Sequence, residues 1–117
     1  MPARLKPAPA AEVSAALERL AQSVEKADLR LLTKHFLAVL EERAPGKSVE
    51  IRVPPYAAVQ VIEGVRHTRG TPPAVIETDA VTWIALAAGT LTWSDAVDQA
   101  RVRASGERTD LSPYLPL

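Results

Sequence analysis

The amino-acid sequence predicts an α+β fold in which helices cover a mixed, mostly antiparallel sheet. Three observations predict it. Apolar residues recur at helical spacing over the first third of the chain, they then alternate with polar residues as in a strand, and a capped helix later separates two strand-like segments. Strands joined by short turns pair antiparallel, whereas a helical crossover allows a parallel pair, so we expect a mixed sheet with helices on one face.

Two helices are predicted before the first strand. From Ala10, apolar residues three and four apart form one stripe that reaches Val24. Asp28 is placed to cap a second helix, because its carboxylate can accept a hydrogen bond from a free backbone N–H. The pair Pro45-Gly46 ends that helix. His35 lies on or beside the apolar stripe, so we expect it to be partly buried with one ring nitrogen satisfied.

Three strand-like segments follow. Apolar and polar residues alternate strictly over Ser48–Val53, as in a strand with one wet face. Tyr56–Ile62 is apolar at positions of both faces, which predicts a strand inside the sheet with cover on each side. A long loop precedes a third strand at Ala74–Glu77.

Helix-capping residues mark the predicted helix ends in the last third of the chain. Asp79, or Thr78 before it, is placed to begin a helix that Gly89 ends in the left-handed conformation. Thr92 begins a second, short helix with the spacing of a capping box. Arg101–Ala104 alternates like a final strand, and we expect the apolar residues near the C-terminus to pack against the domain.

Composition restricts the class of protein. A chain of 117 residues suits one domain, assigned to residues 10–117 after a proline-rich flexible tail at residues 1–9. The absence of cysteine excludes disulfides, thiolate zinc sites and thiol nucleophiles, and 14 basic against 14 acidic residues disfavour nucleic-acid binding. No signal-peptide core or membrane-length apolar run is evident. We therefore expect a cytoplasmic protein without membrane insertion, metal or cofactor.

Several segments resemble the sterol carrier protein family. Val75–Ala96 followed by Arg101–Gly106 matches its pattern of strand, glycine-terminated helix, second helix and short basic strand. Val53–Gln60, His67–Pro73 and Tyr114–Leu117 are similar to the small actinobacterial branch of bacterial orthologs. The resemblance implies a sheet of about five strands and an apolar cavity, between sheet and helices, for an acyl chain or other lipid. Unlike peroxisomal members, the chain ends without a Ser-Lys-Leu-type address.

Two tryptophans flank the predicted glycine stop and are candidates for the wall of such a cavity. Ligand pockets are largely apolar with a few placed polar groups. Alternatively, both indoles simply fill the core, since a buried tryptophan contributes a large apolar area wherever it sits. The proposed apolar wall comprises Val59, Val61, Trp83, Leu86, Leu91 and Trp93.

A basic loop is the candidate for the mouth of the cavity. Arg66, His67 and Arg69 fall in one segment bounded by glycine and proline. Guanidinium groups match the oxygens of a carboxylate or phosphate head group. The alternative is a solvated loop whose arginines pair with Glu63 or Glu77.

No catalytic residue is assigned. Glu77 and Asp79 are two apart at a strand end, but capping already gives Asp79 a structural role, and no Gly-x-Ser-x-Gly elbow is present. The sequence thus favours a non-catalytic binding or carrier domain for a lipid or acyl-type ligand, as a monomer or weak homodimer. Two alternatives stay open: an interaction domain that partners an enzyme, or a small isomerase-like accessory domain with His67 as general base.

Overall fold

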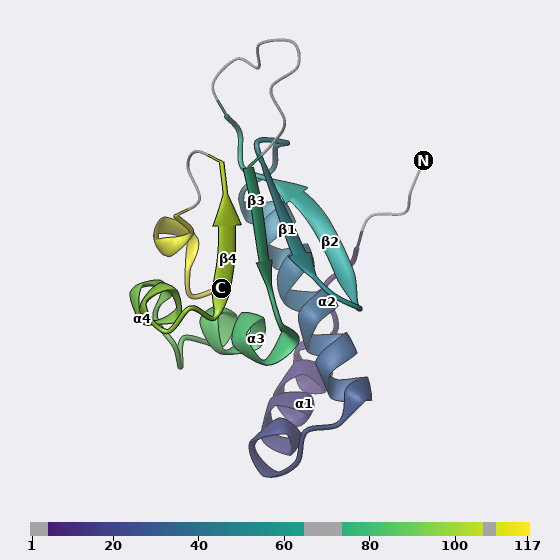
Figure 1. Ribbon diagram of the computed structural model, residues 1–117. Helices are drawn as coiled ribbons and strands as arrows, with labels where there is room; N and C mark the ends of the chain where they lie inside the picture. Colours follow the sequence, from purple (N-terminus) through teal and green to yellow (C-terminus); the bar gives the residue numbers. More distant parts are fainter. Residues whose placement is uncertain (1–4, 65–73, 107–109) are drawn as a thin grey trace.

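The computed structural model describes residues 5–64, 74–106 and 110–117. Helix α2 runs along one face of an open sheet, α1 packs on α2, and α3 and α4 follow beneath the sheet (Figure 1). Along the chain the elements are α1 (Ala10–Gln22), α2 (Lys26–Arg43), β1 (Val49–Val53), β2 (Ala57–Val61), β3 (Ala74–Thr78), α3 (Ala80–Ala88), α4 (Trp93–Asp98), β4 (Val102–Ser105) and the 3-10 turn η1 (Ser112–Tyr114).

The sheet is mixed and mostly antiparallel, as predicted. Its order is β2-β1-β3-β4, with antiparallel pairs β1–β2 and β3–β4 around a parallel pair β1–β3. The described residues form four strands rather than about five. The predicted interior position of the second strand is wrong, because β2 lies at an edge of this sheet and Ala58 and Gln60 are exposed. Alanine counts as apolar in a sequence pattern, yet it has so little side chain that exposure costs little.

Both N-terminal helices form, but the predicted role of Asp28 is wrong. Helix α2 begins at Lys26, and its N-cap residue Glu25 makes no side-chain cap bond. Asp28 lies inside the first turn with 5 % of its surface exposed. The Arg19 side chain donates to its carboxylate from Nε and Nη2 at 2.9–3.2 Å. Asp28 therefore joins α2 to α1, through a tertiary contact that local spacing does not reveal.

The core lies between α2 and the sheet. Every second residue of β1 is buried, which confirms the alternation predicted for this strand. Trp83 of α3 is fully buried, and its indole Nε1 donates to the Thr33 carbonyl of α2 at 3.3 Å. The large apolar residues on the buried side of α2 are Leu32, Phe36, Leu37 and Leu40.

The caps of the last third are confirmed. The Asp79 carboxylate accepts from the Thr82 N–H at 3.1 Å and begins α3. Gly89 ends α3 with φ of 87°, a conformation that glycine adopts without a Cβ penalty. The Thr92 hydroxyl accepts from the Asp95 N–H at 3.1 Å and begins α4.

Both ends of the described chain pack against the domain. Leu111 is fully buried, and the Leu117 N–H donates to the Ala87 carbonyl at 2.9 Å, which confirms that the C-terminal residues are packed. At the other end, Leu5 and Ala8 of the predicted tail contact the core. Whether residues 1–9 are flexible as a whole stays a prediction.

Candidate functional site

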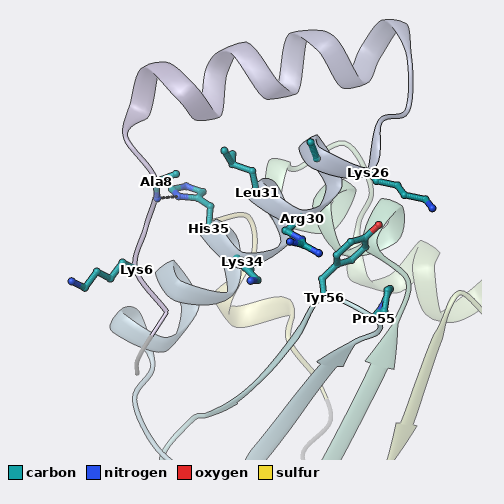
Figure 2. A pocket seen from close by; sticks show the side chains of 10 residues that line it. Lys6, Ala8, Lys26, Arg30, Leu31, Lys34, His35, Pro55 and Tyr56 are labelled. Atoms are coloured by element: carbon teal, nitrogen blue, oxygen red, sulfur yellow. Dashed lines mark hydrogen bonds between the residues drawn. The ribbon is translucent and has the colours of Figure 1, made fainter. Parts of the chain in front are cut away.

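A groove of about 740 Å³ opens between α2, the segment before α1 and the turn that joins β1 to β2 (Figure 2). This volume lies within the roughly 300–1,000 Å³ typical of small-molecule sites. The groove is outside the core, at the end of the sheet where that turn meets α2. Its lining residues are Lys6, Ala8, Lys26, Ala27, Arg30, Leu31, Lys34, His35, Pro55 and Tyr56.

Helix α2 supplies six of the lining residues through two neighbouring rows. Side chains four apart lie on the same side of a helix, one above the other. One row is basic: Lys26, Arg30 and Lys34. The adjacent row is mostly apolar: Ala27, Leu31 and His35. Because the rows run side by side, α2 presents an apolar strip edged by cations.

The segment before α1 closes one side of the groove and is tied to α2. The Ala8 backbone N–H donates to Nδ1 of His35 at 2.9 Å. Nδ1 must therefore be unprotonated, and the proton of the neutral ring resides on Nε2. The imidazole also packs edge-on against Phe36, with ring centroids 4.9 Å apart. The expectation of a partly buried His35 with one satisfied nitrogen is confirmed.

The environment of His35 favours its neutral form. Burial lowers the pKa of His35 below its ordinary value of 6.5, because desolvation penalises the charged imidazolium. Protonation would also place a donor on Nδ1, opposite the Ala8 N–H. The hydrogen bond between the N-terminal segment and α2 thus belongs to the neutral state of this histidine.

The turn between β1 and β2 forms the opposite wall. The Tyr56 N–H donates to the Val53 carbonyl at 2.9 Å, which fixes the turn. Tyr56 projects toward α2, and its ring and the Arg30 side chain extend into the same space (Figure 2). A tyrosine offers both an apolar ring and a hydroxyl, so it can contact either part of an amphipathic molecule.

A second, smaller hollow of about 200 Å³ lies between the α3–α4 connection and the C-terminal segment. Three residues of the predicted wall meet there, Leu86, Leu91 and Trp93. Serine and threonine are its polar lining residues, and it holds no charged side chain. The full lining is Leu86, Gly89, Leu91, Thr92, Trp93, Ser112, Leu115 and Pro116.

The other three residues of the predicted wall are elsewhere. Val59, Val61 and Trp83 are at most 7 % exposed and belong to the core cluster. They line neither the groove nor the smaller hollow. The structure therefore divides the predicted wall between the core and the hollow beside Trp93.

Comparison with protein families identifies the chain over most of its length. Residues 25–117 match the family model described as "Bacterial SCP ortholog". The chain belongs to this bacterial sterol-carrier-protein-like family. A search of curated proteins finds no match.

The family match begins one residue before α2. It thus contains the α2 rows and the Tyr56 turn, whereas Lys6 and Ala8 precede the matched range. The groove of this family member is accordingly built from a matched helix and turn and from an N-terminal wall outside the match.

The predicted polar mouth, Arg66, His67 and Arg69, lies outside the described residues. Its role stays a prediction. The neighbouring acidic pair can be placed: Glu77 and Asp79 line a hollow of about 270 Å³ together with Arg101 and Arg103.

Asp79 is engaged in structure. Burial alone would raise the pKa of Asp79, but hydrogen bonds from the Thr82 hydroxyl and N–H and the charge of Arg101 outweigh it, so the pKa lies below its ordinary value. Because Asp79 is held ionised and bonded to Thr82, it is a poor proton carrier near neutral pH. Among the residues described, no group of acidic or histidine side chains is arranged to hold a metal ion, and no helix is long and apolar enough to cross a membrane.

Sequence reasoning missed the groove residues on α2. The signal was present, since a basic row and an apolar row with the same four-residue spacing lie side by side between Lys26 and His35. Exposed cations on a helix are ordinary, however, and only the packing of residues 6–8 and of Tyr56 turns this strip into the floor of a groove.

Proposed function

We propose that this domain binds a lipid or acyl-type ligand without transforming it, and that the groove on α2 is the site. Membership of the sterol-carrier-protein-like family supports the ligand class. The observation that carries the site is the groove itself, which has the volume of a small-molecule site and an apolar lining made by Ala27, Leu31 and Tyr56.

The energetics suit an alkyl chain. Burying a methylene contributes roughly 0.8 kcal/mol, so several methylenes along Leu31 and Tyr56 offset much of the cost of association. In this proposal the ligand lies at the end of the sheet beside α2. Fuller insertion between the layers would require Trp83 and the apolar side of α2 to separate, because these residues fill that space.

The lining supports binding rather than catalysis. None of the ten lining residues is a serine, threonine, cysteine or carboxylate, so the groove offers no serine, threonine or cysteine nucleophile and no carboxylate base. His35 already uses Nδ1 to accept from Ala8. The smaller hollow at Leu86, Leu91 and Trp93 is the alternative site for a short chain.

A series of neutral alkanols tests this function without involving charge. Titration calorimetry with hexanol, octanol and decanol is expected to give saturable heats, with affinity rising up to about fourfold per added methylene. Native mass spectrometry of protein purified without delipidation is expected to show bound lipid. Absence of saturable binding by every alkanol, together with lipid-free protein, would contradict the proposal.

A further inference from the structure

We propose that the groove on α2 selects amphiphiles with an anionic head group, a carboxylate or a phosphate, over neutral molecules with the same alkyl chain. This inference rests on the proposed function and assigns the ligand class of the same site. Its basis is the distribution of charge: Lys6, Lys26, Arg30 and Lys34 line the groove, and none of its lining residues is acidic.

The cations of the groove are not neutralised by neighbouring acids. Across residues 5–64, 74–106 and 110–117, the salt bridges join Arg19 to Asp28 and Arg52 to Glu50. The acids nearest to the basic row in sequence are engaged elsewhere, since Asp28 is bound by Arg19 and Glu25 accepts from the Ser23 hydroxyl.

Overall composition does not explain this concentration of charge. The chain carries 14 basic and 14 acidic residues, so a random groove would be neutral on average. Four cations around one apolar floor therefore form a local positive field, which attracts an anion and raises its concentration at the groove.

The hydrogen-bonding groups have the same polarity. Lysine and arginine are donors without acceptor capacity, and the neutral His35 ring keeps its remaining proton on Nε2 because Nδ1 accepts from Ala8. Donors thus dominate the polar lining. Such a set complements the oxygens of a carboxylate or phosphate and leaves a neutral alcohol with no comparable advantage.

The arrangement in Figure 2 gives a mode of binding. Arg30 lies in the middle of the groove beside Tyr56, while Lys6 and Lys26 lie toward its opposite ends. A head group at Arg30 and Lys34 would leave the alkyl chain against Leu31 and the Tyr56 ring. The long stems of lysine and arginine can follow the chain while their charged ends stay in water.

A matched set of ligands tests the inference: decanoate, decyl phosphate, decanol and decyltrimethylammonium, titrated calorimetrically into the full chain. The two anions are expected to bind about tenfold more tightly than decanol at low salt, and the cation more weakly. The advantage of the anions is expected to shrink as salt is added, because Lys6, Lys26 and Arg30 are exposed and therefore screened.

Paired variants identify the residues responsible. Arg30→Gln with Lys34→Gln is expected to reduce the anion advantage, taken as the ratio of decanoate to decanol affinity within the same variant, to about twofold. The control, Arg43→Gln with Lys47→Gln, removes the same charge from exposed positions outside the groove and is expected to keep the full advantage. Circular dichroism of both double variants verifies that each remains folded.

Each outcome decides the inference. Equal binding of decanoate and decanol, or an anion advantage that survives in the groove variant, overturns it while the proposed function stands. Failure of every ligand overturns both. Sedimentation with vesicles of phosphatidylcholine, alone or mixed with phosphatidylglycerol, separates sources of the anion. If the protein sediments with phosphatidylglycerol vesicles but does not bind monomeric decyl phosphate, it attaches to a charged surface. That result also overturns the inference.

Discussion

The groove on α2 and the hollow beside Trp93 offer two very different environments within one small domain. The groove measures about 740 Å³ and carries four cations, whereas the hollow measures about 200 Å³ and has no charged lining residue. The difference follows from which segments of the chain surround each site. Three segments distant in sequence surround the groove, while the α3–α4 connection and the C-terminal segment close tightly around the hollow, helped by the Leu117 hydrogen bond to α3.

This comparison shows why apolar lining alone does not identify a ligand site. The hollow is lined by Leu86, Leu91 and Trp93 of the predicted wall, but its volume falls below the roughly 300–1,000 Å³ of typical ligand sites. The groove has a volume within that range. Its basic row lies along one side of the apolar row, and this asymmetry can orient an amphipathic molecule. The following predictions separate the two regions, and both from the core.

The largest effect is expected for the two tryptophans. Trp83→Ala should lower the free energy of unfolding by about 3–5 kcal/mol, because the indole is fully buried and its removal leaves a cavity. Trp93→Ala, at the partly exposed wall of the hollow, should cost about 1 kcal/mol or less. Urea denaturation followed by circular dichroism measures both. Equal losses would contradict the assignment of Trp83 to the core and of Trp93 to a surface hollow.

Matched leucine truncations compare the groove and the hollow as binding sites. Leu31→Ala should weaken decanoate binding about tenfold, since it removes apolar contact worth about 1–2 kcal/mol from the groove floor. Leu91→Ala removes the same atoms from the hollow and should leave the affinity unchanged. The reverse pattern in calorimetry would move the ligand to the hollow beside Trp93.

The N-cap of α3 is expected to make a pH-dependent contribution to the stability of the domain. Asp79→Ala should cost about 1 kcal/mol of stability at neutral pH, as expected for loss of an N-cap. Because the folded state lowers the pKa of Asp79, this contribution is present above about pH 4 and is lost as pH falls through the lowered value. Unfolding measured at several pH values should therefore show the variant and the wild type converging in acid. A constant difference would contradict the role of the ionised cap.

The smallest effect is expected at the N-terminal wall of the groove. The pKa of His35 is lowered by burial, so the unfolded chain takes up the proton first as pH falls below about 6.5. Stability should decline from there down to the lowered pKa of the folded state, and the Ala8 amide should exchange faster with solvent. His35→Gln keeps an acceptor but does not titrate, so its Ala8 exchange should lack this pH dependence. If exchange of the Ala8 amide in the wild type does not change as pH falls, the link between the charge of His35 and this hydrogen bond is refuted.

Local patterns predicted most of the fold because they report local causes. The alternation over Val49–Val53, the cap at Asp79 and the stop at Gly89 each depend on neighbouring residues, and all three form as predicted. Tertiary contacts account for the errors. Asp28 has the spacing of a cap but is taken by Arg19 of α1, and the second strand is an edge strand because β3 returns to the other side of β1.

The candidate site was less predictable than the fold. The family resemblance drew attention to the tryptophans and the basic loop, whereas the groove depends on residues 6–8 lying against α2 and on a turn residue facing that helix. No spacing in the sequence encodes that meeting of three segments. The two rows of residues four apart between Lys26 and His35 can be read from the sequence. The segments that pack beside them cannot.

The most direct test is an amide chemical-shift titration of the full ¹⁵N-labelled chain with decanoate. Saturable shifts are expected at the amides of Leu31, His35 and Tyr56, while the amide signals of Leu91 and Trp93 should not move. Shifts concentrated around Trp93, or no saturable shifts at any described amide, would contradict the claim that the groove on α2 is the ligand site.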